Sequence, residues 1–220
     1  MILLSINMPT LNIFITITCL VIAVAIVWRF ASRRRELPCP AWLHWLVELD
    51  NPFTQTNRSA FIVEHLGLAP GMAVLDAGCG PGRLTVPVAK HVGAAGAVVA
   101  LDLQSGMLER ARQKVAAAGL NNVRFVHAGL GEGRLPRGCF DRALLITVLG
   151  EITQPKAALA EIFAALKPGG ILSVTEVIFD PHFQGCSTVS ALASEAGFVI
   201  GKRWGHRLAY VQHLEKPDVA

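Results

Sequence analysis

The sequence predicts an α/β fold in which a mostly parallel sheet is covered by helices on both faces and is preceded by one transmembrane helix. Three observations predict it. A long uncharged apolar run opens the chain, strand-like and helix-like segments alternate from residue 51 onward, and two strand-like segments with a short connection close it. Such alternation is typical of doubly covered parallel sheets. A short connection between strands requires an antiparallel hairpin.

The composition fits one folded domain with an appendage. Of the 220 residues, 52% are hydrophobic and 16% are charged, which excludes a disordered chain. The net charge of +4 comes from Arg29, Arg33, Arg34 and Arg35, so no basic stripe remains to bind nucleic acid. The five cysteines are widely spaced without a Cys-x-x-Cys pair. This pattern favours neither a disulfide framework nor a zinc ribbon, and it is typical of a reducing compartment.

The first predicted element is a membrane anchor over residues 1–35. No side chain up to residue 28 is charged, and residues 11–28 are apolar except for Asn12, Thr16 and Thr18. A helix over residues 9–28 would be roughly 30 Å long, the thickness of a hydrocarbon core. A signal peptide or a buried core helix fits less well, because a cluster of arginines follows. That cluster predicts a single-pass protein with its catalytic domain on the cytoplasmic side.

Residues 36–56 are expected to form a juxtamembrane segment. A helix over residues 40–50 would place four apolar side chains on one stripe, namely Trp42, Trp45, Leu46 and Leu49. Two interpretations of this stripe stay open. The helix would lie on the bilayer surface, where tryptophan is favoured, or it would pack on the domain that follows.

Residues 57–220 are expected to form the domain. Strands are predicted at residues 73–76, 97–102, 123–127, 140–147, 170–178, 199–204 and 208–214. Helices are predicted at residues 83–92, 107–118, 155–166 and 187–196. Gly119 ends the second helix, the run Lys167-Pro-Gly-Gly170 ends the third, and Gly205 separates the last two strands.

A glycine-rich turn after the first strand predicts a ligand site. The strand ends in Asp76, and Gly78, Gly80 and Gly82 follow before a helix. Bare backbone lets a ligand approach, the helix start offers free N–H groups, and ligands of such sheets bind at the carboxyl ends of the strands. Asp102 ends the next strand, 20 residues after Gly82. Because an acid at that distance can accept both hydroxyls of a ribose, the ligand is expected to contain a nucleoside.

Two classes of nucleoside ligand fit this spacing. A dinucleotide site usually shows G-x-G-x-x-G, with room for a pyrophosphate at the helix start. Here the third glycine comes one residue earlier. The negative charge of Asp76 opposes a phosphate but suits an amino group or a sulfonium.

Four segments of the domain carry a family resemblance: Val74-Leu-Asp-Ala-Gly-Cys-Gly-Pro-Gly82, Val99-Ala-Leu-Asp102 with Met107-Leu108, Phe140-Asp141, and Leu166-Lys-Pro-Gly-Gly170. With them, residues 57–217 resemble the class I S-adenosylmethionine-dependent methyltransferases. The resemblance implies a Rossmann-like, seven-stranded sheet with an antiparallel last strand, and S-adenosyl-L-methionine as the cofactor. Segments 176–183 and 210–217 look closest to the quinone-biosynthesis and phospholipid methyltransferase group.

The resemblance also implies the cofactor site. Gly78 and Gly80 would line the methionine part, Asp102 would hold the ribose, and Asp76 would orient the amino group. The other implied cofactor-binding residues are Ala77, Cys79, Gly82, Leu103, Met107, Gly129, Leu130 and Thr147, of which Leu103 and Met107 would flank the adenine. Gly129 and Leu130 stand where the family often has an aspartate that contacts the adenine amine. Backbone groups or Glu132 would have to take its place.

The catalytic candidates follow the ends of the fourth and fifth strands: Glu151, Glu176, Asp180 and His182. Methyl transfer from a sulfonium chiefly requires alignment of the acceptor, and a protein base only if the acceptor loses a proton early. As alternatives, Glu151 would cap a helix and Asp180 would form a turn with Pro181. No metal is expected, because the pair formed with Cys186, four residues after His182, lacks a third ligand.

The predicted anchor favours a lipophilic, membrane-associated methyl acceptor, such as a quinone precursor or a lipid headgroup. Tethering would raise the effective concentration of acceptors in the bilayer. The expected partners are therefore the bilayer and a lipophilic or small-molecule acceptor, and no nucleic acid. Two alternatives are a tethered methyltransferase of a small soluble acceptor and a catalytically inactive cofactor-binding scaffold.

Overall fold

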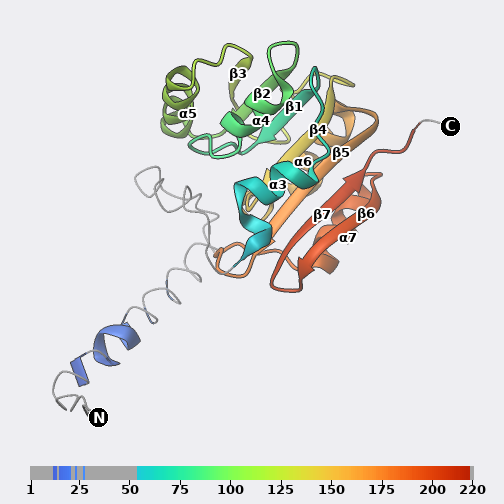
Figure 1. The fold of residues 1–220 in the computed structure, drawn as a ribbon. Helices are drawn as coiled ribbons and strands as arrows, with labels where there is room; N and C mark the ends of the chain where they lie inside the picture. Colours follow the sequence, from blue (N-terminus) through green and yellow to red (C-terminus); the bar gives the residue numbers. More distant parts are fainter. Residues whose placement is uncertain (1–11, 14, 21–22, 24–26, 28–53, 219–220) are drawn as a thin grey trace, which may run out of the picture.

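The computed structural model describes residues 12–13, 15–20, 23, 27 and 54–218. Seven strands form one sheet in the order β3-β2-β1-β4-β5-β7-β6 (Figure 1). Neighbouring strands are parallel from β3 through β5, and β7 is antiparallel to both β5 and β6. The predicted mostly parallel sheet with an antiparallel last strand is confirmed.

The strands are β1 Ala73–Ala77, β2 Ala97–Asp102, β3 Val123–His127, β4 Phe140–Ile146, β5 Leu166–Val177, β6 Val199–His206 and β7 Ala209–Glu215. The helices are α3 Ser59–His65, α4 Thr85–Val92, α5 Ser105–Ala117, α6 Pro155–Ala165 and α7 Cys186–Glu195, with 3-10 turns η2 Gln55–Asn57 and η3 Leu149–Glu151. Every predicted strand and helix of the domain is present, within four residues of its expected bounds. The α3 helix and both 3-10 turns were not predicted.

The largest difference between the predicted and the observed elements lies at the start of β5. The run Lys167–Gly170, predicted to end a helix, already belongs to this strand. Leu166 pairs with Phe140, and the register shifts before Arg142 pairs with Ile171. The Gly169 N–H donates to the Lys216 carbonyl, and the Lys216 N–H donates to the Gly170 carbonyl. Leu166 therefore pairs with β4, and Gly169 and Gly170 bond to the residue that follows β7, although the Pro-Gly-Gly sequence is typical of a turn.

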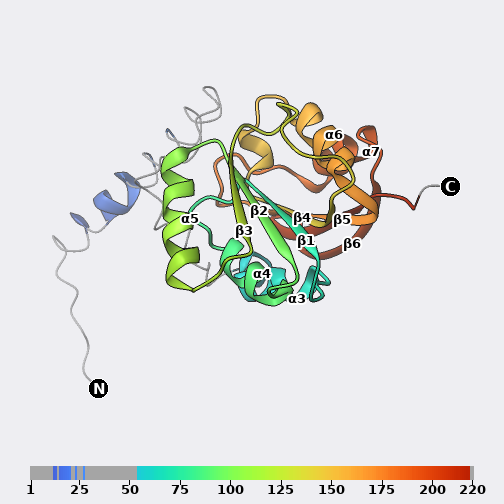
Figure 2. The ribbon, with the colours of Figure 1, turned by 90° about the horizontal axis from the view of Figure 1, so that it is seen from above.

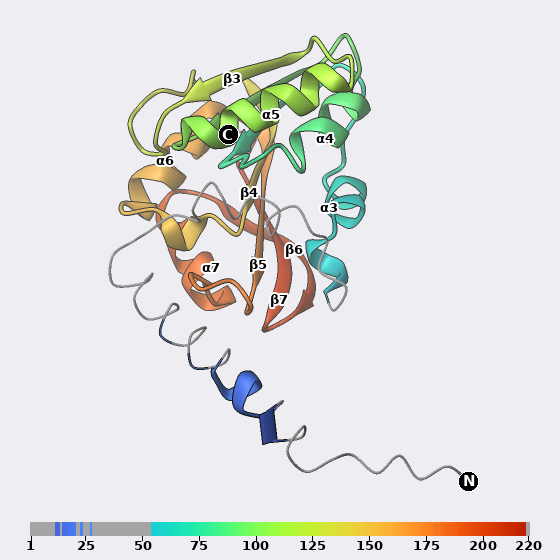
Figure 3. The same ribbon diagram turned by 90° about the vertical axis from the view of Figure 1, so that its left-hand side faces the viewer.

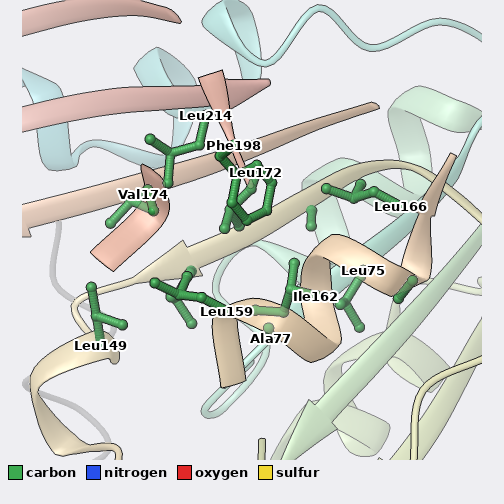
Figure 4. Close-up of a cluster of buried hydrophobic side chains, with 14 of the residues drawn as sticks. Leu75, Ala77, Leu149, Leu159, Ile162, Leu166, Leu172, Val174, Phe198 and Leu214 are labelled. Carbon is green, nitrogen blue, oxygen red and sulfur yellow. The ribbon is translucent and has the colours of Figure 1, made fainter. Parts of the chain in front are cut away.

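Helices cover both faces of the sheet. Figures 2 and 3 show α3 and α4 on one side and α6 and α7 on the other. A large core cluster, which includes Leu75, Leu159 and Ile162, lies between the sheet and α6 and α7 (Figure 4). A second cluster, which includes Val74 and Val88, lies under α3 and α4. Val74 and Leu75 join different clusters because successive residues of a strand point to opposite faces.

Side chains fasten the amino ends of the central strands. The Asp141 carboxylate of β4 accepts the Ala73 N–H of β1 at 2.8 Å and forms an ion pair of 2.7 Å with Lys167 of β5. Arg142 donates through Nε to the Leu66 carbonyl at 3.0 Å. One short segment of β4 therefore connects β1, β5 and the end of α3.

The carboxyl ends of the same strands form the opposite edge. From β1 the chain proceeds outward through β2 to β3, and then returns to β4 on the other side of β1. In parallel sheets, ligands bind at such a reversal of strand order, outside the carboxyl ends. The loops after β1, β2, β3, β4 and β5 all leave the sheet at this edge.

The N-terminal prediction requires a correction. Among the residues described, no helix combines the length and the apolar composition needed to cross a bilayer. The described residues between 12 and 27 are helical with exposed side chains. The predicted localisation, a single-pass membrane protein with its domain on the cytoplasmic side, is contradicted by this finding and is wrong.

The remaining residues of the predicted anchor and most of the predicted juxtamembrane segment, including its stripe at Trp42, Trp45, Leu46 and Leu49, lie outside the described residues. The proposed boundaries at residues 35 and 56 stay predictions.

Candidate active site

The glycine-rich loop after β1 is held against the end of β2. The N–H groups of Gly78 and Cys79 both donate to the Leu101 carbonyl, at 2.8 and 3.0 Å. Gly78, Gly80 and Gly82 have φ angles of +73°, +52° and +83°, a region that favours glycine. A Cβ at Gly78 would lie 2.6 Å from Val148 Cγ2. The loop therefore requires glycine for its conformation and for packing against the β4 end, in addition to any ligand.

Asp102 lies at the end of β2 and is nearly buried. Its Oδ2 accepts the Gly80 N–H and its Oδ1 accepts the Gln104 N–H, each at 2.8 Å. Burial raises the pKa of Asp102, while these two amide hydrogen bonds oppose the shift. Each carboxylate oxygen keeps a second acceptor site, so Asp102 offers two fixed acceptors to a pair of hydroxyls.

Asp76 lies beside this loop at the end of β1, with a side chain that is 3% exposed. Thr85, the first residue of α4, donates from Oγ1 to Asp76 Oδ2 at 2.6 Å. Burial raises the pKa of Asp76 to about 6. The carboxylate is thus ionised at neutral pH but poorly solvated, an environment that favours a cationic partner.

The residues predicted to lie near an adenine belong to two loops. Leu103 follows Asp102 and is 58% exposed, whereas Met107 is buried in α5. The loop after β3 begins where the Ala128 N–H donates to the Asp102 carbonyl at 3.2 Å. A Cβ at Gly129 would lie 2.6 Å from Glu132 Oε1. The Glu132 carboxylate therefore lies over Gly129, where the aspartate of the resembled family is missing, and its substitution for that aspartate stays a prediction.

Thr147 marks the carboxyl end of β4. Its φ of 54° is the only positive value at a non-glycine residue in the described part of the chain, and such an angle is rare for a β-branched side chain. Its N–H donates to the Thr175 carbonyl and its hydroxyl to the Ile146 carbonyl, both at 2.8 Å. Strained backbone of this kind clusters at functional sites, and here it lies where the strand order reverses.

The structure brings the four catalytic candidates together. His182 Nδ1 lies 3.6 Å from Glu151 Oε1 and 4.0 Å from Asp180 Oδ1. The His182 N–H donates to Asp180 Oδ1 at 2.7 Å. A Cβ at Gly150 would collide with the His182 carbonyl oxygen. The segment after β5 therefore packs directly on η3, with the His182 ring beside the Glu151 carboxylate.

Glu176 is the most deeply buried of the four, with 1% of its surface exposed. Its Oε2 accepts the Gln184 N–H at 2.9 Å. Burial raises the pKa of Glu176 to about 8, and the charges of Asp180 and Glu151 add to the increase. Glu176 is therefore largely protonated at neutral pH, whereas the Glu151 side chain is 20% exposed and more accessible to an acceptor.

Sequence reasoning missed the residues that support this site. Thr85 could have been suspected, because a hydroxyl at the start of a helix often binds a nearby polar group. The hydroxyl of Tyr210 donates to the Gln184 carbonyl, and the Glu161 carboxylate accepts two N–H groups of the loop after β3. Gln184, Tyr210 and Glu161 carry no local sequence signal, because their partners come from other elements. A groove of about 470 Å³ lies elsewhere, between α4 and α5. Of the predicted site residues, only Gly82 lines this groove.

Residues 74–170 match the family model described as "Methyltransferase domain". This segment is therefore similar to methyltransferase domains. A relative from Vibrio vulnificus named ubiquinone/menaquinone biosynthesis C-methyltransferase UbiE is 37% identical over 125 residues, which cover 55% of this chain and 48% of the relative. The protein of the same name from Shewanella pealeana is 37% identical over 123 residues, covering 56% and 49%. The chain therefore spans about half the length of the curated relatives it matches.

Solved structures agree on the fold. A SAM dependent methyltransferase from Aquifex aeolicus superimposes with a TM-score of 0.73 at 22% identity, covering 81% of this chain and all of that one. The 4+2 cyclase SpnF superimposes with a TM-score of 0.65 at 21% identity, covering 72% and 80%. The predicted class of domain, the S-adenosylmethionine-dependent methyltransferase, is confirmed, and S-adenosylmethionine is the cofactor of that class.

Proposed function

We propose that this protein transfers a methyl group from S-adenosylmethionine to a ring carbon of a lipophilic, quinone-like acceptor. The observation that carries the proposal is Asp102, whose two oxygens are fixed by the Gly80 and Gln104 amides beside a bare glycine loop. The names of the similar C-methyltransferases support the class of acceptor. No tether to a bilayer is part of this proposal.

The residues at the carboxyl edge fit this cofactor. The Asp102 oxygens would accept the two ribose hydroxyls, and the buried, ionised Asp76 would face the cationic amino group. Gly78 and Gly80 would leave space for the methionine chain, and Leu103 would cover one face of the adenine. When bound, the cofactor supplies an electrophilic methyl group on its sulfonium.

Glu151 is the proposed proton acceptor. It lies in η3 directly after β4, close enough to Asp102 for its charge to help raise the pKa of that residue. In ring methylation the acceptor carbon forms a bond to the methyl group, the methyl–sulfur bond breaks with its electron pair going to sulfur, and the ring carbon then loses its proton. The Glu151 carboxylate would take that proton, and His182 at 3.6 Å would stabilise its charge beforehand.

Calorimetry tests the cofactor part of the proposal. The wild-type protein is expected to bind S-adenosylmethionine but not a nicotinamide dinucleotide, and Asp102→Ala is expected to lose about a hundredfold in affinity, because two charge-assisted hydrogen bonds disappear. Glu109→Ala is the matched control, since Glu109 is exposed on α5 and contacts only Arg112 and Gln113 of the same helix in the described structure. Equal affinities of wild type and Asp102→Ala would refute the ribose assignment.

Transfer of a radiolabelled methyl group tests the acceptor part. Three acceptors are compared: a demethylated quinol, a phospholipid headgroup and a soluble catechol. Label on a ring carbon of the quinol supports the proposal. Label on the headgroup or only on the soluble acceptor refutes the quinone-like class, and cofactor binding without any transfer favours an inactive scaffold.

A further inference from the structure

Glu161 of α6 reaches across to the loop that follows β3. Its Oε2 accepts the Gly131 N–H at 2.5 Å and its Oε1 accepts the Leu135 N–H at 2.9 Å. We propose that Glu161 is a positioning residue for the adenine of the cofactor, acting through this loop, residues 128–135. The proposal rests on the proposed cofactor site and deepens it.

The loop is anchored at several points. Ala128 and Leu135, at its two ends, are buried in the core cluster under α6. Gly131 has a φ of +93°, and a Cβ there would lie 3.2 Å from Ala157 Cβ. The middle of the loop therefore rests on the first turn of α6, while Glu161, farther along that helix, holds two of its amides. Charge-assisted bonds to backbone amides are short and strong.

The position of the loop connects it to the cofactor. Asp102 at the end of β2 pairs in register with His127 at the end of β3. A nucleoside whose ribose is held by Asp102 and whose base extends toward β3 therefore meets this loop first. The loop also contains Gly129 and the Glu132 carboxylate that lies over it. Both hydrogen bonds described for the Glu161 carboxylate are with loop amides, so Glu161 would act on the adenine only through the backbone that it orders.

Two substitutions disturb the loop, one by changing the Glu161 carboxylate and one by changing the loop itself. Glu161→Gln keeps the size of the side chain, but its amide can accept one N–H while its NH₂ opposes the other. Gly131→Ala disturbs the same loop without changing Glu161, because it strains φ and crowds Ala157. Glu109→Gln on the exposed face of α5 is the matched control for the loss of one negative charge.

The test measures binding of S-adenosylhomocysteine and of S-inosylhomocysteine, in which a carbonyl replaces the adenine amine, by calorimetry. Wild type and Glu109→Gln are expected to prefer the adenine compound. Glu161→Gln and Gly131→Ala are expected to bind it about tenfold more weakly while binding of the inosine compound changes little, so that the preference shrinks.

Three results would count against these ideas in different ways. Failure of the wild type to bind either compound refutes the proposed cofactor site itself. Unchanged affinity and preference in Glu161→Gln refutes the positioning role. An equal loss for both compounds, accompanied by a lower melting temperature, shows that Glu161 only supports the fold and also refutes it.

Discussion

Glu176 and Tyr210 lie opposite each other in the antiparallel β5–β7 pair, and both bind the backbone of one residue, Gln184. Glu176 accepts the Gln184 N–H at 2.9 Å, and the Tyr210 hydroxyl donates to the Gln184 carbonyl at 2.7 Å. Both side chains are almost fully buried. The segment that carries Asp180 and His182 is therefore fixed from inside the sheet, on the side where the acceptor is proposed to bind.

Tyr210→Phe is expected to loosen this segment. The Gln184 carbonyl loses its donor, which should cost about 1–3 kcal/mol of unfolding free energy. If His182 and Glu151 act on the acceptor, kcat should fall by roughly tenfold or more, because small misplacements of catalytic groups are costly. Affinity for S-adenosylmethionine should stay within about twofold. Activity assays measure kcat, calorimetry measures the affinity for S-adenosylmethionine, and urea unfolding measures the unfolding free energy.

Ser173→Ala is the control for Tyr210→Phe. It deletes a buried hydroxyl from the opposite face of β5, away from Gln184. An equal drop in kcat for both variants would mean that the Tyr210 effect is a general loss of stability rather than a displacement of His182.

Glu176→Gln is expected to change how stability depends on pH. The pKa of Glu176 is raised from 4.5 to about 8 in the folded protein, so the folded state retains a proton that the unfolded state releases. The free energy of unfolding should therefore fall as pH rises from about 4.5 to 8, by at most about 1.4 kcal/mol per pH unit, and level off above that range. The neutral glutamine removes this contribution.

Urea unfolding at pH 5, 6.5, 8 and 9 measures that dependence. The difference in unfolding free energy between Glu176→Gln and wild type should grow between pH 5 and 8 and then stay constant. A difference that is independent of pH would mean that Glu176 titrates near its ordinary pKa in the folded protein.

Gly78→Ala is expected to abolish cofactor binding and to destabilise the domain. The new methyl group would collide with Val148, and alanine disfavours the φ of +73°. Adding Val148→Ala should relieve the collision and recover part of both losses. Gly71→Ala is the matched control, because its φ of +86° is similar but its Cβ would meet open space. The φ strain alone should then cost about 1–2 kcal/mol.

A double-mutant cycle of melting temperature and cofactor affinity measures these effects. If Gly71→Ala destabilises the protein as much as Gly78→Ala does, the contact with Val148 is not what requires glycine at position 78.

Thr85→Val is expected to shift the pH dependence of cofactor binding. With a pKa of about 6, Asp76 becomes neutral as pH falls below that value, and affinity for the cationic amino group of S-adenosylmethionine should fall with it. Removal of the Thr85 hydrogen bond, which lowers the pKa of Asp76, should move this loss of affinity to higher pH.

Thr85→Ser keeps the hydroxyl and should behave like wild type in the same binding titration from pH 5 to 8. Identical profiles for Thr85→Val and Thr85→Ser would show that Asp76 does not face the amino group.

Much of the fold could be predicted from the sequence because its strands are buried and its turns are marked. Val74 and Leu75 lie in a short apolar run that ends in Asp76, and Gly119 ends its helix as expected. The start of β5 could not be predicted, because partners from β4 and the end of β7 decide whether Leu166–Gly170 is a turn or a strand.

The positions of the site residues could be predicted better than their partners. Asp76 and Asp102 could be predicted because each lies at the end of a short apolar strand, and Glu151 and His182 lie at the edge of the sheet where they were expected. The deep burial of Glu176 and its bond to Gln184 could not be predicted, because they depend on how β7 and the segment after β5 pack in three dimensions. The apolar N-terminal run misled the prediction of localisation, because among the described residues no helix is long and apolar enough to cross a bilayer.

The two edges of the sheet differ in how much change they tolerate. Asp141 connects β1, β4 and β5 at their amino ends, so it helps to fix the strand register at the edge opposite the proposed ligand site. Loops at the other edge can lengthen, shorten or exchange residues without altering that register. Changes confined to the segments after β4 and β5 would therefore alter the proposed acceptor site while the strand register stays the same.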